Sequence, residues 1–171
     1  MKVYTDIFTR DELFSDSYPM KTEYEGFIYN VSSKFMVKDE DEDILYDPDQ
    51  FEKLENKPEN TTKVDQIVDS FHLVEIPGIE KVKQLVDTIG PYLSTLRAKI
   101  EKESAEKLAK FNEQVKKFLA EQVGKDIKNY KFYQGESNDM DKSMLIFQKF
   151  NDDGKTSQLY FFVDGLKEVK M

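Results

Sequence analysis

Residues 77–124 read PGIEKVKQLVDTIGPYLSTLRAKIEKESAEKLAKFNEQVKKFLAEQVG, and this stretch decides the fold of the chain. Its apolar residues recur in alternating steps of three and four, which places them on one face of an α-helix. Two such runs are separated by a short polar gap, so the sequence predicts an antiparallel helical hairpin. The first run is Ile79, Val82, Val86, Ile89, Leu93, Leu96 and Ile100, and the second is Leu108, Phe111, Val115, Phe118 or Leu119, and Val123.

The residues at the ends of the two runs are typical of helix ends. Pro77 fits the first turn of a helix, where its missing N–H removes no hydrogen bond. Ser104 is expected to be the N-cap of the second helix, and Gly124 its C-cap. Gly90-Pro91 lies inside the first helix, and because the apolar spacing continues through it we expect a kink rather than a break.

The segments on either side of the hairpin are typical of β-strands, because they are rich in β-branched and aromatic residues. Thr9–Asp16 is expected to be a polar turn with one buried pair, Leu13 and Phe14. Asn151–Gly154 predicts a tight turn between the last two strands, because glycine accepts a positive φ. The chain is therefore expected to be α+β, an antiparallel sheet with the hairpin of residues 77–124 inserted. The expected strands are Lys2–Phe8, Pro19–Tyr24, Gln66–Ile76, Tyr130–Glu136, Ser143–Phe150 and Gln158–Val163, and Phe27–Lys38 is expected to be a strand or a hairpin.

Residues 39–60 differ sharply in composition from the rest of the chain. They hold ten acidic residues and two lysines, a local charge of −8. Like charges at this density repel one another, so we expect a mobile acidic loop. Residues 79–125 carry a local charge of +3, so the molecule is expected to be a charge dipole.

The overall composition excludes several classes of protein. A net charge of −9 argues against nucleic-acid binding driven by bulk charge. The absence of cysteine removes disulfides, thiolate zinc sites and cysteine nucleophiles, and it fits a cytosolic protein. No signal-peptide pattern or long apolar run is present, so we expect no stable membrane insertion. The 171 residues are enough for one domain with a core of its own.

Three short segments resemble one known family. Asp11-Glu12-Leu13-Phe14-Ser15-Asp16 resembles the opening of translationally controlled tumor proteins. Residues 127–136, IKNYKFYQGE, resemble the C-terminal signature of that family, and residues 160–166, YFFVDGL, resemble its ending. The resemblance covers essentially the whole chain. Gln134 departs from the small or aliphatic residue usual before Gly-Glu, and residues 48–60 lack the family's Gly-Gly-Asn-x-Ser-x-Glu motif.

The resemblance implies a tent-like β fold, similar to that of Rab-type exchange factors and type B methionine sulfoxide reductases. It also implies a cytosolic, non-enzymatic protein with several partners: calcium, tubulin or microtubules, and small GTPases of the Rheb type, in growth and survival. Those structural relatives often hold zinc through cysteines, and this chain has none. No tightly bound cofactor is expected.

Glu12 is the residue that the resemblance implies in GTPase contact. An exposed carboxylate acts on a GTPase by competing for its phosphate-site lysine or its Mg²⁺. The alternative is that Asp11 and Glu12 only solvate a turn and favour a short helical start after Thr9. Glu136 is unassigned, and it is expected to cap a buried network or line a groove, next to a close backbone approach or a bend at Gly135.

Weak calcium binding is expected in the acidic segment, because Ca²⁺ prefers six to eight oxygen ligands. The segment has no EF-hand spacing, and the alternative is a solvated loop. Asn151–Gly154 superficially resembles a calcium turn but is interpreted as a hairpin. The candidate calcium ligands are Asp39, Glu40, Asp41, Glu42 and Asp43.

The outer face of the predicted hairpin carries lysines in the region to which the family maps tubulin binding. Because tubulin is acidic, charge would steer the encounter. The alternative is an ordinary solvated helix face. These lysines are Lys99, Lys102, Lys107, Lys110, Lys116 and Lys117.

Two functions of other classes remain open. One is an acidic calcium buffer without specific protein partners. The other is an enzyme with a cleft in the sheet, which the lack of cysteine, the single histidine and the absence of a phosphate-binding loop disfavour. His72, the one histidine, is expected to be a strand residue at the sheet surface.

Overall fold

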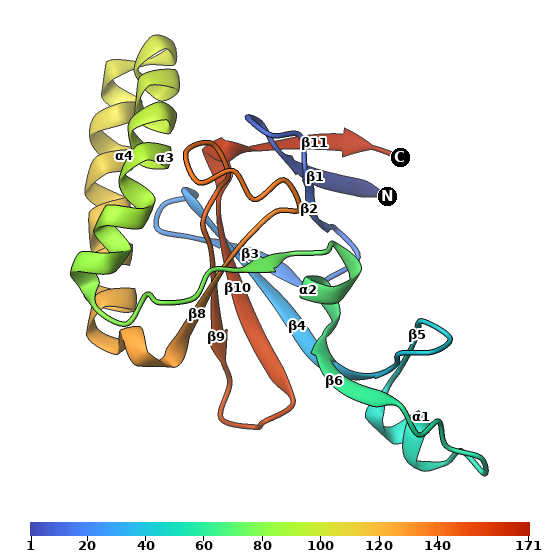
Figure 1. Cartoon of the computed structure of the whole chain (residues 1–171). Helices are drawn as coiled ribbons and strands as arrows, with labels where there is room; N and C mark the ends of the chain where they lie inside the picture. The colour runs from blue at the N-terminus through green and yellow to red at the C-terminus, as the bar shows by residue number, and fades with distance from the viewer.

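A computed structural model describes all 171 residues of the chain, and Figure 1 shows its layers. A large antiparallel sheet has the strand order β3-β4-β10-β9-β8-β7, and a smaller sheet has the order β11-β1-β2. The helical hairpin of α3 and α4 covers one face of the large sheet. The strands are β1 (Lys2–Asp6), β2 (Glu12–Ser15), β3 (Met20–Glu23), β4 (Ile28–Asp39), β5 (Ile44–Tyr46), β6 (Thr61–Asp65), β7 (Val74–Glu75), β8 (Tyr130–Gln134), β9 (Ile146–Phe150), β10 (Thr156–Phe162) and β11 (Leu166–Lys170).

The helical elements lie between these strands. The α-helices are α1 (Pro48–Glu52), α2 (Gln66–Ser70), α3 (Val82–Glu103) and α4 (Ala105–Lys117). The chain continues from α4 into the π-helix η1 (Phe118–Val123) and the 3-10 helix η2 (Gly124–Asn129), and a last 3-10 turn is η3 (Val163–Gly165). The predicted α+β class with an inserted helical hairpin is confirmed.

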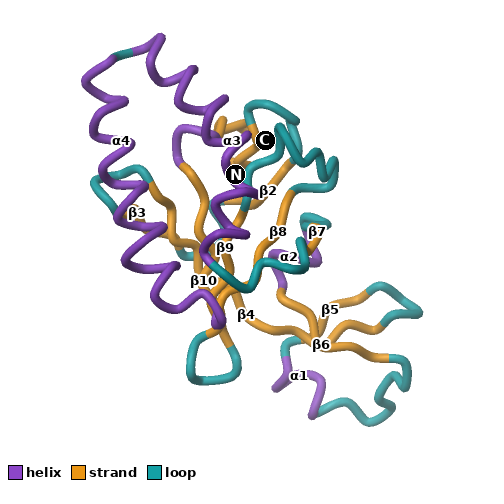
Figure 2. The backbone as a smooth tube through the Cα atoms, turned by 60° about the vertical axis from the view of Figure 1, so that its left-hand side comes forward, coloured by secondary structure: helices purple, strands orange, loops and turns teal.

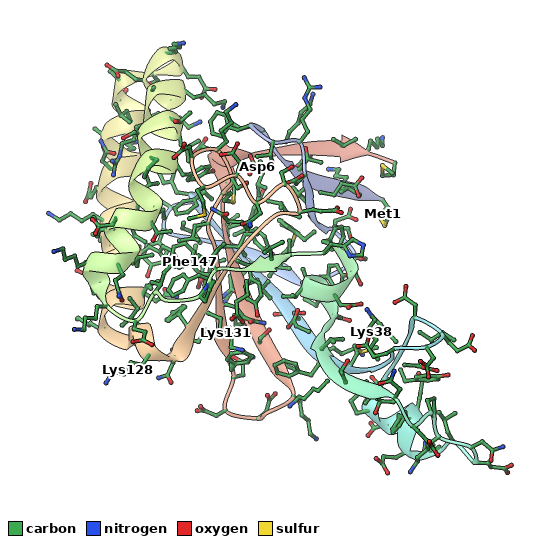
Figure 3. The ribbon with its side chains drawn as sticks, in the orientation of Figure 1. Met1, Asp6, Lys38, Lys128, Lys131 and Phe147 are labelled. Atoms are coloured by element: carbon green, nitrogen blue, oxygen red, sulfur yellow. The ribbon has the colours of Figure 1, made fainter.

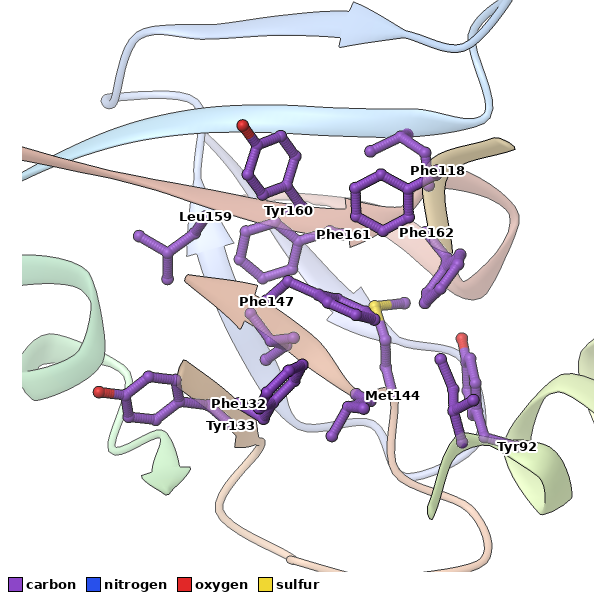
Figure 4. Packing of buried hydrophobic residues seen from close by; sticks show 14 of the residues in the cluster. Tyr92, Phe118, Phe132, Tyr133, Met144, Phe147, Leu159, Tyr160, Phe161 and Phe162 are labelled. Atoms are coloured by element: carbon purple, nitrogen blue, oxygen red, sulfur yellow. The ribbon is translucent and has the colours of Figure 1, made fainter. Parts of the chain in front are cut away.

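The core lies on both faces of the large sheet, because side chains alternate between the faces of a strand. On the hairpin face, the ring of Phe118 lies 5.1 Å from that of Phe147 and 5.5 Å from that of Tyr160 (Figure 4). On the other face, the ring of Phe14 in β2 lies 4.3 Å from that of Phe161. Since both faces are covered, β10 is buried along most of its length.

The start of α3 differs from the prediction. Gly78 has a φ of +86°, which no right-handed helix continues, so Pro77 lies in the linker and α3 begins only at Val82. The Gln84 Oε1 atom caps this end by accepting hydrogen bonds from the Glu80 N–H (2.8 Å) and the Lys81 N–H (2.9 Å). Pro91 lies inside the helix without breaking it.

The second helix begins as predicted and ends differently. The Ser104 hydroxyl accepts a hydrogen bond from the Lys107 N–H, which confirms the predicted N-cap. Gly124 keeps a right-handed φ of −61°, so the chain continues into η2 instead of stopping at a left-handed glycine cap.

Several strand predictions need correction. Gln66–Ile76 is not one strand, because the Asp65 carboxylate caps α2 and the chain then turns at His72, whose φ is +54°. The predicted turn Thr9–Asp16 contains strand β2, whose buried Leu13 and Phe14 face the core as expected. Strand β11 was not predicted. The turn at Asn151–Gly154 is confirmed, with Gly154 at a φ of +68°.

The acidic segment, residues 39–60, is not free of regular structure. Its first residue, Asp39, ends β4 and is buried, and the segment also contains β5 and α1. With β6 it forms a projection that extends away from the rest of the molecule in Figure 2. Asp39 is its only buried residue, and none of its residues belongs to the hydrophobic core. Its mobility stays a prediction.

Candidate functional site

The two signature segments, far apart in sequence, meet at one point on the surface. We call this point the acidic junction and define it as Asp11, Glu12, Gly135, Glu136 and Ser137. The two Asp11 carboxylate oxygens accept hydrogen bonds from the Ser137 N–H (2.9 Å) and from the Ser137 hydroxyl (2.6 Å). This bidentate contact fixes the loop that precedes β2 against the loop that follows β8.

Gly135 allows this close approach. A Cβ atom at this position would lie 2.8 Å from the Asp11 Cβ and 3.0 Å from the Leu13 Cδ2. These distances are shorter than packed carbon atoms adopt, so a side chain would push the two loops apart. The close backbone approach expected at Gly135 is therefore confirmed.

Glu12 and Glu136 are the exposed carboxylates of the junction. Glu12 lies on β2, an edge strand of the small sheet, and Glu136 directly follows Gly135. Neither side chain takes part in a hydrogen bond or ion pair within the chain. The structure thus brings together the two chain segments that carry these residues, and it leaves both carboxylates without a partner in the chain.

Asp6, labelled in Figure 3, is linked to the junction by its backbone N–H, which donates a hydrogen bond to the Asp11 carbonyl at 2.9 Å. The sequence analysis did not single out this residue. Its buried carboxylate accepts hydrogen bonds from the Phe8 N–H (2.9 Å) and from the Met144 N–H (2.8 Å). Burial raises the pKa of Asp6 above its ordinary value, and the hydrogen bonds from Met144 and Phe8 oppose that shift. The hydrogen bond to Phe8 could have been predicted, because an Asp at the start of a polar turn often accepts a hydrogen bond from the backbone N–H two residues on. The bond to Met144 has no sequence signal.

The five candidate calcium ligands do not converge. The Asp39 Oδ1 accepts hydrogen bonds from the Asp41 and Glu42 N–H groups, and Asp43 pairs with Lys38 at 3.3 Å. Glu40 accepts a hydrogen bond from Thr62, and Asp41 accepts one from Asn60. Nowhere in the chain do three or more His, Asp or Glu side chains lie together in a geometry for holding a metal ion. Calcium binding here stays a prediction.

The six hairpin lysines divide into two groups. Lys99 and Lys107 pair with Glu103, and Lys117 pairs with Glu113. Lys107 also pairs with Asp164 of η3 at 2.6 Å, and this hydrogen bond raises the pKa of Lys107. Lys107 therefore ties α4 to the end of the sheet, contrary to the expectation of an outer-face residue. The exposed lysines without an ion pair are Lys102, Lys110 and Lys116.

The fold and the junction together define a class: an α+β protein with an inserted helical hairpin, in which two signature segments far apart in sequence meet at the surface. The family model "Translationally controlled tumour protein" matches residues 1–167. The chain belongs to this family. No helix in the structure combines the length and the apolar character that crossing a membrane requires.

Full-length relatives and solved structures agree with this assignment. Translationally controlled tumor protein homologs from Mycosarcoma maydis and Schizosaccharomyces pombe are 33% and 32% identical, with at least 99% of each chain covered. The solved structure of the S. pombe protein p23fyp matches over both whole chains with a TM-score of 0.77 and 29% identity. The Caenorhabditis elegans protein shares the fold, with a TM-score of 0.72, 23% identity, and 100% and 99% of the two chains covered.

Proposed function

We propose that this protein is a non-catalytic binding protein of the cytoplasm, and that the acidic junction contacts a small GTPase of the Rheb type. The family is not known for catalysis. One observation carries the proposal: the bond between Asp11 and Ser137 holds Glu12 and Glu136 at the surface, both without a partner.

The mechanism follows from charge. A GTPase holds its nucleotide with a lysine and with Mg²⁺ coordinated at the phosphates. A carboxylate presented on a rigid edge strand competes for either cation. Because Asp11 is bound to Ser137, the backbone is held in place next to Glu12 and next to Glu136, and less conformational entropy is lost on binding than with a flexible loop.

The test measures binding of a nucleotide-free, a GDP-loaded and a GTP-loaded Rheb-type GTPase. Glu12→Val and Glu12→Gln should fold normally and weaken binding by about tenfold or more, as expected for a lost charge-assisted contact. Glu25→Gln is the matched control, since Glu25 is also an exposed, unpaired carboxylate in a turn. Equal binding by the Glu12 and Glu25 variants would contradict the proposal.

Tubulin binding by the hairpin is a second candidate function. It is favoured by Lys102, Lys110 and Lys116, which lie on α3 and α4 without an ion pair and are available to an acidic surface. Replacing these three with glutamine should reduce co-sedimentation with microtubules, and the wild-type interaction should weaken steeply with salt. Replacing Lys99 and Lys117, which are already paired, should change less.

Weak calcium binding in the acidic segment remains part of the proposal. Titration of isotope-labelled protein with Ca²⁺, with Mg²⁺ as control, should give saturable shifts at a few carboxylates among residues 39–43. Unsaturated shifts spread over residues 39–59 would mean counterion accumulation only. Deleting residues 39–43 should remove calcium binding and leave GTPase and tubulin binding intact, which separates this function from a pure calcium buffer.

A further inference from the structure

A cleft of about 490 Å³ lies on the face of the large sheet that the hairpin does not cover. Phe147 of β9 faces the hairpin, where it contacts Phe118, so the next residue, Gln148, faces the opposite side. Strand β6 and helix α2 form one wall of the cleft, and β8 and β9 form the other. The volume falls within the range of small-molecule sites. The acidic junction contributes no residue to it.

A buried polar network fixes the orientation of Gln148 in this cleft. The Asp65 Oδ2 accepts hydrogen bonds from the Gln148 amide nitrogen (3.1 Å) and the Ser157 hydroxyl (2.7 Å). Since the hydroxyl proton of Ser157 is directed at Asp65, Ser157 can only accept from Gln148, at 3.2 Å. The amide nitrogen must therefore point at Asp65 and Ser157, because the reverse orientation would place two acceptors against each other.

The amide oxygen of Gln148 is left without a partner. Gln148 is 1% exposed, and its Oε1 atom accepts no hydrogen bond. A buried acceptor without a donor is uncommon in folded proteins and calls for an explanation. Gln148 lines the cleft, so a ligand with an N–H group would satisfy the oxygen once small movements of the side chains admit it.

Aromatic rings, lysines and two paired carboxylates line much of the rest of the cleft. The carboxylates are Asp69, paired with Lys38, and Glu75, paired with Lys131. The rings of Phe35 and Phe150 stack at 5.5 Å between centroids, with an interplanar angle of 12°. The Lys63 Nζ lies 4.4 Å from the centroid of Phe35, and the Lys131 Nζ lies 5.5 Å from that of Phe150. Lys131 is paired with Glu75, whereas Lys63 has no ion pair and donates one hydrogen bond, to the Gly154 carbonyl at 3.2 Å. A lysine already lies over each ring, so these rings disfavour a cationic ligand and the lysines favour an anionic one.

We propose that this cleft binds a nucleoside monophosphate. The base lies against the edges of the Phe35 and Phe150 rings, and its exocyclic amino group donates a hydrogen bond to the Gln148 Oε1. The phosphate is bound by Lys63 at the rim of the cleft. An apolar ligand would leave the Gln148 oxygen unpaired, and inorganic phosphate alone would use only the lysine.

The experiment is a titration of isotope-labelled full-length protein with AMP, with adenosine and with inorganic phosphate, followed by NMR. AMP should give saturable shifts at the Gln148 side-chain amide and at residues of the cleft walls. Adenosine should shift the same residues with about tenfold weaker affinity, because it lacks the charge-assisted contact to Lys63. Phosphate alone should leave the Gln148 amide signal unchanged.

Variants separate the contributions of the amide and the lysine. Lys63→Met keeps the aliphatic stem, so it should weaken AMP about tenfold and leave adenosine unchanged. Gln148→Met should weaken both ligands about fivefold. Lys155→Met is the matched control, an exposed lysine outside the cleft whose loss should change neither affinity. If Gln148→Met fails to fold because Asp65 loses a donor, the Lys63 and Lys155 variants still decide the question.

Two results would overturn the proposal. One is the absence of saturable shifts with AMP at the cleft. The other is an equal affinity for AMP in the Lys63→Met and Lys155→Met proteins, because the phosphate would then be bound by a group other than Lys63.

Discussion

At the scale of single residues, Asp11 and Gly135 depend on each other. Asp11 can bind both donor groups of Ser137 only because no side chain at position 135 separates the two loops. The exposed pair Glu12 and Glu136 owes its position to this contact. Asp11 and Gly135 thus position Glu12 and Glu136 without contacting a partner themselves.

Gly135→Ala tests this dependence. The added methyl group would lie 2.8 Å from the Asp11 Cβ, so we expect a loss of about 1–3 kcal/mol in the free energy of unfolding. Gly90→Ala is the control, because a Cβ at that helical position meets no atom of another segment within 4 Å. The gain in helix propensity is opposed by crowding against Pro91, so the free energy of unfolding should change by less than about 1 kcal/mol. Urea denaturation measures both. Equal effects of the two substitutions would disprove the close approach.

The buried carboxyl of Asp6 gives a pH prediction. Its pKa in the folded protein is raised above the ordinary 3.8 by burial, so the folded state retains the proton to higher pH than the unfolded chain does. The stability that Asp6 contributes is therefore fully present below about pH 3.8 and is lost as pH rises through the folded pKa.

The measurement is denaturant unfolding of wild type and Asp6→Asn over a pH series. The variant is expected to be less stable throughout, because its amide nitrogen would face an N–H donor, from Met144 or from Phe8. The difference in unfolding free energy between the two proteins should shrink as pH rises above about 3.8. Parallel pH curves would show that Asp6 does not titrate in this range. Carboxyls with a lowered pKa, such as Glu103 beside Lys99 and Lys107, have the opposite effect, because their contribution to stability is lost as pH falls. This effect is the same in both proteins, so it cancels when the unfolding free energy of the variant is subtracted from that of wild type.

At the scale of elements, the turn between α3 and α4 depends on Ser104. This residue ends α3 and caps α4, with its hydroxyl accepting a hydrogen bond from the Lys107 N–H at 3.2 Å. Ser104→Ala should therefore cost about 1 kcal/mol of unfolding free energy. Ser94→Ala, on the exposed face of α3, should stay within about 0.5 kcal/mol of wild type. Thermal unfolding compares the two, and a similar loss for both would rule out a capping role.

At the scale of the whole molecule, the hairpin and the large sheet share one core, and the acidic segment lies apart from it. Phe118 of η1 is fully buried against rings from β9 and β10. Phe51 of α1 is only partly buried, and the nearest ring to it is that of Tyr46, within the same projection. The two regions should therefore unfold with different free energies.

Hydrogen exchange measures this difference. Phe118→Ala should cost about 3–5 kcal/mol and lower the protection of α3, α4 and β8–β10 together. Phe51→Ala should change exchange only within residues 40–60. Wild-type amides of residues 40–60 are expected to exchange faster than those of β10. If the slowest amides of the acidic segment matched those of β10, its expected mobility would be wrong.

Sequence alone determined the features that depend on neighbouring residues. The apolar spacing in residues 82–100 and 108–123 gave the hairpin, because residues three and four apart share a helix face whatever the rest of the chain does. Ser104 and Gly154 were recognised because capping and positive φ are local requirements. The buried pair Leu13 and Phe14 followed from its polar surroundings. The family resemblance added the expectation that Glu12 is exposed for a partner.

Tertiary structure decided what depends on residues far apart in the chain. The segment after Asp65 became a helix because a carboxylate bound by Ser33, Gln148 and Ser157 also caps it. Asp11 and Ser137 are 126 residues apart in the sequence, and Asp6 and Met144 are 138 residues apart, so no local sequence pattern could predict either hydrogen bond. Lys107 proved to be bound to Asp164 and not free. Local periodicity fixes which face of an element is apolar, but only the folded chain determines which polar groups from distant elements become neighbours.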